Sequence, residues 1–154
     1  MRFSPTIPII TAAAILATGC SESTSPDEIT IGDLAGTWVA ESFEYTAVGN
    51  PALHVDLIAG GGSFTMIISA TGTFSGTTTY ATIGTVTYTG TFAVSNDILM
   101  QDFDEDGIPT LTWTITLFED DSMTIEGAEG PWDFSDDEVN NPVTASIKAV
   151  VVRQ

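Results

Sequence analysis

A run of alternating carboxylates has the spacing of the first half of a calcium-binding loop. Asp102, Asp104 and Asp106 occupy alternate positions, and Gly107 follows them. Alternate residues of a tight loop point inward, so these side chains would supply the hard oxygen ligands that calcium prefers, and glycine permits the sharp turn. The second half of the pattern fails, because Trp113 stands where a bidentate glutamate is expected. We therefore reject an EF-hand and keep two interpretations, a calcium-binding turn and a solvated acidic turn.

A second acidic stretch, at residues 133–140, precedes the last apolar run of the chain. If the chain forms a meander barrel, this stretch and the Asp102 run lie in loops that one strand pair separates, so they can meet at one rim and share an ion. Calcium is the only cofactor for which the sequence offers a ligand set, and we expect any such binding to be weak, as in extracellular modules.

No constellation of residues predicts catalysis. His54 is the single histidine and has no neighbour in sequence that would form a triad or a zinc site. A G-x-S-x-G elbow does not occur, and the three glycines at 60–62 lack the lysine and the following helix of a phosphate loop. Carboxylates are numerous, but Glu41 and Glu44 fall on opposite faces of one predicted strand. We expect the protein not to be an enzyme.

Cys20 is the only cysteine, and it stands where an N-terminal export signal would end. Arg2 supplies a positive charge, residues 7–17 are apolar, and small residues precede the cysteine. The apolar run is shorter than the roughly 20 residues that a spanning helix needs. The segment resembles a bacterial lipoprotein signal, which implies a signal peptide at 1–19 and a lipid on Cys20. The alternative is an ordinary secretory signal with a chance cysteine.

This resemblance also predicts where the protein is located. Residues 20–30 would be the lipidated cysteine and a polar, flexible tether, and residues 31–154 the folded domain. The lipid would anchor the domain to the bacterial cell envelope. Because Ser21 and not an aspartate follows the cysteine, the resemblance favours the outer membrane.

The charge of the chain excludes several partners. It has 21 acidic residues, all after Cys20, and only Lys148 and Arg153 as basic residues in that part. Nucleic acid is excluded because binding to phosphates needs clustered lysine and arginine. Anionic lipid headgroups are excluded for the same reason, so any membrane contact should be through the lipid anchor alone. We expect a monomer.

Alternation of apolar and hydroxyl residues runs through the domain and predicts antiparallel strands with one wet face. The clearest case is Leu111, Trp113, Ile115 and Leu117, which alternate with threonines. Eight strands are predicted, at 37–47, 62–69, 73–80, 85–93, 98–101, 110–118, 123–126 and 143–152. Short turns join most of them, which favours a meander, and closure removes its two edges. We therefore predict an all-β fold, an eight-stranded antiparallel up-and-down barrel, with a two-sheet sandwich as the alternative.

The start of the first strand carries a motif. Gly36 and Trp38 form a G-x-W sequence after a short turn that contains Leu34. This arrangement resembles the lipocalin-like families, in particular small bacterial lipocalin-like lipoproteins. The resemblance implies that the segment before the first strand closes one barrel end, that Trp38 packs over that end, and that a basic residue of the last strand, here Arg153, stacks on its indole.

Two functions from different classes are open at this point. The resemblance implies a binding module that holds a small apolar or amphipathic ligand, and an eight-stranded barrel is just wide enough for one. The inward rows are also bulky enough to fill a narrow barrel, which would give a solid structural or interaction domain, with or without calcium. The sequence does not identify ligand-binding residues, and a cavity would favour the first function.

Overall fold

The computed structural model describes residues 28–119, 121–134 and 142–154, and these form one all-β domain. The predicted signal peptide and Cys20 lie outside the described residues. Within those residues no helix has the length and apolarity needed to cross a membrane. The strands are β1 (Gly36–Ala47), β2 (His54–Asp56), β3 (Ser63–Ile68), β4 (Thr73–Tyr80), β5 (Gly84–Ser95), β6 (Ile98–Phe103), β7 (Leu111–Glu119), β8 (Ser122–Trp132) and β9 (Val143–Arg153).

The sheet closes on itself. From β3 to β9 each strand pairs antiparallel with the next one in sequence, and β1 pairs with β3 on one side and with β9 on the other. The long register between β1 and β9 runs from Trp38 opposite Arg153 to Ala47 opposite Ala145. Eight strands therefore form a closed ring, and the predicted antiparallel up-and-down barrel is confirmed. The sandwich alternative is wrong, because its two end strands would not pair.

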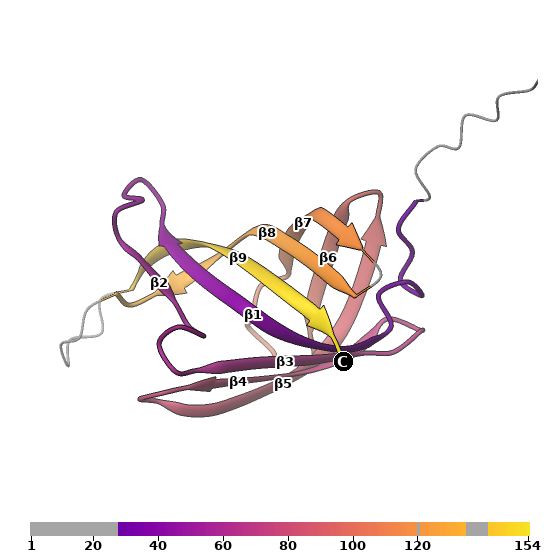
Figure 1. The fold of residues 1–154 in the computed structure, drawn as a ribbon, viewed down its shortest axis with the longest axis horizontal. Helices are drawn as coiled ribbons and strands as arrows, with labels where there is room; N and C mark the ends of the chain where they lie inside the picture. The colour runs from indigo at the N-terminus through magenta and orange to yellow at the C-terminus, as the bar shows by residue number, and fades with distance from the viewer. Residues whose placement is uncertain (1–27, 120, 135–141) are drawn as a thin grey trace, which may run out of the picture.

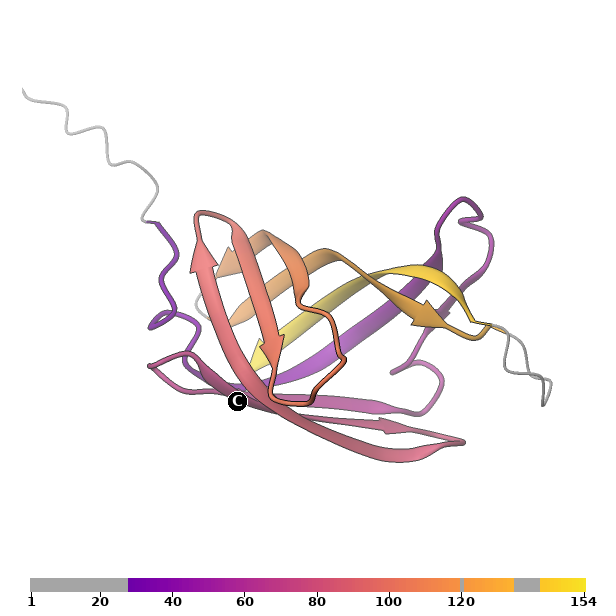
Figure 2. The same ribbon diagram turned by 180° about the vertical axis from the view of Figure 1, so that it is seen from behind.

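The ring is flattened rather than round. In Figure 1 the strands β3, β4 and β5 run beneath β1, β8 and β9, and β6 and β7 connect the two groups. Figure 2 shows the reverse side, with β5 to β7 nearest the viewer and β1 and β9 behind them. The apolar side of every strand faces the space between these groups, as the alternation predicts.

The short strand β2 was not predicted. It pairs with the second half of β1, with Glu44 opposite Asp56. The carboxylate of Asp56 accepts hydrogen bonds from the backbone N–H of Ile58 (2.8 Å) and of Phe43 (3.3 Å), and this holds the following turn against β1. The second half of β1 therefore pairs with β2 instead of β3.

The two ends of the barrel differ. The segment at residues 28–35 packs at the end where β1 begins and β9 ends, as Figure 1 shows. The largest fully buried side chains lie towards this end: Leu34, Trp38, Met66, Leu99, Met123 and Val151. We call this half of the barrel the closed half, and its end the closed end. The opposite half, which we call the open half, ends at the β4–β5 and β6–β7 connections, and we call that end the open end.

Candidate functional site

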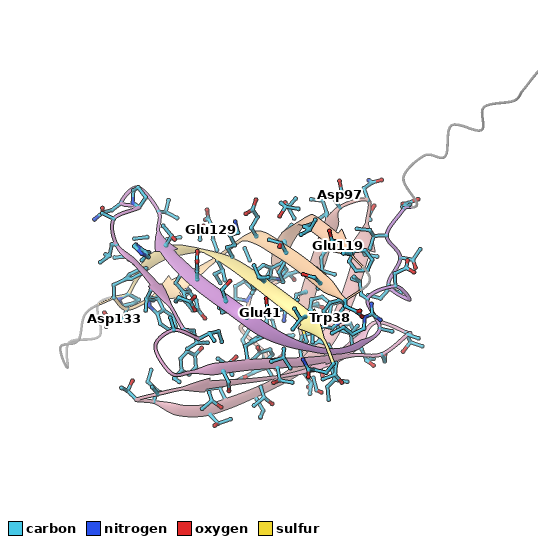
Figure 3. All side chains as sticks on the ribbon, viewed as in Figure 1. Trp38, Glu41, Asp97, Glu119, Glu129 and Asp133 are labelled. Carbon is cyan, nitrogen blue, oxygen red and sulfur yellow. The ribbon has the colours of Figure 1, made fainter. Side chains whose placement is uncertain are left out.

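Trp38 and Arg153 lie together at the closed end, as the resemblance predicts. The Trp38 side chain is fully buried, and its Nε1–H donates to the carbonyl of Leu34 at 2.8 Å. The carbon at the centre of the Arg153 guanidinium lies 4.7 Å from the centroid of the indole ring. Figure 3 labels Trp38 beside the end of β9. This is the geometry of a cation–π contact between the first and last strands.

Arg153 also ties the N-terminal segment to the barrel. Its Nη1 donates to the carbonyl of Ala35 at 2.8 Å and its Nη2 to the carbonyl of Asp33 at 2.6 Å. The planar fork of a guanidinium suits two such acceptors, which a lysine could not bind together. Hydrogen bonds from the side chain and the backbone of Thr30 lower the pKa of Asp33. The closed end is therefore a structural lid.

The open half of the barrel contains a cavity of about 230 Å³. All eight strands of the ring contribute to its wall, and Glu105 and Ile108 of the β6–β7 connection lie at its mouth. Eight of its eighteen lining residues are aromatic: Phe43, Tyr45, Phe64, Tyr80, Tyr88, Phe92, Phe103 and Trp113. A mostly apolar cavity with a few polar groups is the usual form of a small-molecule site.

One glycine of the sheet makes room for an aromatic ring of this wall. Gly76 of β4 lies opposite Tyr88 of β5, and a Cβ atom at Gly76 would fall on the Tyr88 ring. At Gly90 of β5 a Cβ atom would meet first the backbone carbonyl of Asp102 on β6 and then the ring of Phe74, which does not line the cavity. The Tyr88 ring thus covers Gly76 and forms part of the cavity wall.

Gln101 places an amide in the cavity wall. The side chain is 5% exposed, and its Oε1 accepts a hydrogen bond of 3.0 Å from Nε1–H of Trp113. An indole nitrogen only donates, so this bond requires the carbonyl oxygen of the amide to face Trp113 and the NH₂ group to face elsewhere. Gln101 is the one amide among the residues of the wall.

A pair of hydroxyls forms a second polar point. Oγ1 of Thr78, a residue that is 3% exposed, lies 3.0 Å from the hydroxyl oxygen of Tyr88. Burial raises the pKa of Tyr88 to about 12 against the opposing hydrogen bond with Thr78. Burial, followed by the neighbouring Tyr80, raises the pKa of Tyr45 further still. Both phenols are therefore neutral at physiological pH.

The carboxylates of the predicted calcium turn do not converge on one point. Asp104 accepts a hydrogen bond of 2.6 Å from the hydroxyl of Thr89, and Asp102 accepts one of 3.0 Å from Thr110. In the described part of the chain no group of three histidine, cysteine, aspartate or glutamate side chains is placed to hold a metal ion. The inward-pointing loop geometry expected for Asp102, Asp104 and Asp106 is therefore not present, because β6 extends to Phe103 and alternation sends Asp102 outward.

Other predicted residues lie away from the cavity. Most of the second acidic stretch falls outside the described residues, as does the predicted lipidation site. His54 lies on β2 and lines a second pocket, beside Tyr80 and Trp132, and not the cavity wall. Asp97, Glu119 and Glu129, labelled in Figure 3, are exposed on the outer surface. Sequence reasoning missed Gln101 and Thr78, although both are polar residues on inward rows, which is the signal that would have identified them.

Comparisons with known proteins found similarity to solved structures alone. No protein-family model matches the chain, and no curated protein matches it. Among solved structures, a lipocalin-like protein from Bacteroides uniformis is similar, with 16% identity, a TM-score of 0.48, and coverage of 80% of this chain and 100% of that one. Bovine odorant binding protein, in complex with a selenium-containing odorant, has 12% identity, a TM-score of 0.44, and coverage of 84% and 76%. The barrel assignment rests on the strand pairing and not on these likenesses.

Proposed function

We propose that this protein is a lipid-anchored binding module of the bacterial cell envelope, which holds a small apolar or amphipathic ligand inside its barrel. The observation that carries the proposal is the aromatic cavity of about 230 Å³. A cavity of roughly 150 Å³ accommodates benzene, so the volume here suits a ligand of about nine non-hydrogen atoms. The cavity favours this function over the alternative of a solid structural domain.

The distribution of packing supports the same proposal. Fully buried side chains fill the closed half of the barrel, whereas the aromatic rings of the open half line a cavity. A filled half makes the barrel rigid, and a rigid wall keeps the cavity formed before the ligand arrives. Binding then requires little ordering of the protein. In flexible sites the loss of conformational entropy on ordering weakens the affinity.

Native mass spectrometry of residues 21–154, purified from cells, tests for a bound molecule directly. The matched variants are Ile147→Trp, which enlarges a side chain of the cavity wall, and Ser146→Trp, which adds the same ring to the outer side of β9. We expect the first variant to lose the co-purifying mass and the second to retain it. Retention by both variants, with circular dichroism showing a native fold, would exclude the cavity as the site.

The location is proposed from the sequence alone. The sequence before the domain resembles a lipoprotein signal, and the described chain enters the barrel at the closed end. A lipid on Cys20 would then leave the open end clear of the anchor. Anchoring and ligand binding are separate parts of the proposal, and each has its own test.

A further inference from the structure

Among the described residues, the amino group of Gln101 has no hydrogen-bond partner. Oε1 is occupied by Trp113, and none of the hydrogen bonds of the described residues uses Nε2. In the described part of the chain, Nε of Arg153 is the only side-chain polar atom that is inaccessible to solvent and has no hydrogen-bond partner. Nε2 of Gln101 is therefore not such an inaccessible atom. The NH₂ group of Gln101 is thus open to the cavity that its side chain lines. It is a fixed donor in an apolar wall.

The Thr78–Tyr88 pair offers a second donor to the same cavity. Two hydroxyls carry two protons, and their mutual hydrogen bond uses one of them. Tyr88 cannot become a phenolate below strongly alkaline pH, because burial raises its pKa to about 12. The pair therefore keeps a proton to donate at every physiological pH.

No cationic group accompanies these donors in the wall. Lys148 points outward, where its Nζ lies 3.6 Å from a carboxylate oxygen of Glu126. Arg153 is bound to backbone carbonyls at the closed end. Glu105 is the one charged residue of the wall, and it lies at the mouth. A carboxylate ligand would lose its hydration without gaining a counter-charge, which is strongly unfavourable.

From these groups we infer the ligand class, building on the proposed function: a compact, neutral, aromatic or alicyclic molecule with one hydrogen-bond acceptor, such as a ketone or an ester, and not a fatty acid. The Gln101 amide donates to the acceptor, and the aromatic rings of the wall contact the rest of the ligand. An unmatched buried donor loses binding energy when the ligand lacks an acceptor. Gln101 is thus the residue that distinguishes acceptor-bearing ligands from pure hydrocarbons.

Three probes of the same size and branching test this inference: cumene, acetophenone and benzoate. Each has a benzene ring and a three-atom branched substituent, so the probes differ only in an isopropyl, a methyl ketone and a carboxylate group. Affinities are measured by NMR titration of the ¹⁵N-labelled domain, in which the Gln101 side-chain amide is a direct reporter. The variants are Gln101→Met, which keeps the shape of the side chain, Tyr88→Phe, which keeps the ring, and Gln154→Met, a control outside the cavity.

We expect Gln101→Met to weaken acetophenone by about three- to tenfold relative to cumene, the loss of one neutral hydrogen bond. Gln154→Met should leave both affinities unchanged, and benzoate should bind the unmodified protein at least about tenfold more weakly than acetophenone. Equal loss of cumene and acetophenone in Gln101→Met would overturn the inference but leave the cavity as a binding site. So would benzoate binding as tightly as acetophenone. Failure of all three probes to bind would overturn the proposed function as well.

Discussion

The contact between Trp38 and Arg153 predicts a measurable energetic coupling between the first and last strands. Arg153→Met keeps an apolar stem but removes the cation and both hydrogen bonds to the N-terminal segment. The stacking contributes up to about 2 kcal/mol when desolvated, and a hydrogen bond from a charged donor contributes more than a neutral one. We therefore expect Arg153→Met to lower the free energy of unfolding by about 2–4 kcal/mol.

Trp38→Leu should cost about 2–4 kcal/mol, because a fully buried indole and its hydrogen bond to Leu34 are replaced by a smaller side chain. The double variant should be less destabilised than the sum by about 0.5–2 kcal/mol. Only the stacking is shared between the two residues. The hydrogen bonds of Arg153 to Asp33 and Ala35 survive the loss of the indole, so they do not enter the coupling.

Urea denaturation followed by far-UV circular dichroism measures all four proteins of the cycle. Leucine is chosen instead of alanine because domains of this size have a total stability of only about 5–15 kcal/mol. Lys148→Met is the matched control: it removes a basic residue from the same strand, but the ion pair with Glu126 is exposed, and its loss should change stability by less than about 1 kcal/mol. Losses that add within about 0.5 kcal/mol would refute the contact and the assignment of Trp38 and Arg153 to the barrel closure.

Three further predictions address the cavity wall and the anchor. Gly76→Ala should destabilise the domain by about 1–3 kcal/mol in urea unfolding and displace the Tyr88 ring, because the added methyl group overlaps that ring. In the control variant Gly130→Ala, no atom lies closer than 4.0 Å to the new Cβ. This variant should be as stable as the unmodified protein or slightly more stable, with an unchanged near-UV dichroism spectrum. The absorbance of tyrosinate should show Tyr88 ionising near pH 12. Since the pKa of tyrosine in the unfolded chain is about 10, the stability that the neutral Tyr88 phenol contributes is present below pH 10 and is lost as the pH rises through 12. The free energy of unfolding of a Tyr88→Phe variant should therefore decline less steeply above about pH 10. Cys20→Ser should move the protein from the detergent phase to the aqueous phase without changing its dichroism, and a variant that stays wholly in the detergent phase would show that anchoring does not depend on Cys20.

The strands were largely predictable because burial imposes a period of two on each of them. Each predicted range overlaps an observed strand, and the range 73–80 coincides with β4. The largest error was in β8, predicted at 123–126 and observed as Ser122–Trp132. Gly127 adopts a φ of 96° at a register shift between Glu126 and Ala128. Such a bulge reverses the alternation, so the second half of the strand was out of phase with the first.

The short β2 could not be predicted by the same method. Three residues are too few for a periodic pattern, and the strand depends on contacts that are distant in sequence. The backbone N–H of Leu57 donates to the carbonyl of Phe43 at 2.9 Å, and Asp56 caps the turn that follows. The first interaction joins backbone groups and has no sequence signature, and the Asp56 cap predicts a local turn but not the pairing with β1.

The site was predictable only in part, for a different reason. The pairing of Trp38 with Arg153 follows from a recognisable motif together with closure of the ring. The alternation identifies inward residues but not the space that they leave, because a cavity is the small difference between the volume of the ring and that of its side chains. The role of Gln101 also depends on the register of β6 against β7, which brings its amide to the indole of Trp113.

The uneven packing of the barrel gives the physical reason for proposing an occupant. A residual apolar cavity destabilises a protein by about 24 cal/mol per Å³, so a volume of about 230 Å³ corresponds to at most about 5.5 kcal/mol. This is comparable with the whole stability of many domains. Larger side chains at positions such as Ile125 or Ile147 would remove that cost, as Trp38, Leu99 and Met123 do in the closed half. A ligand that fills the cavity offsets the same cost reversibly, and its binding free energy then appears as added stability of the fold.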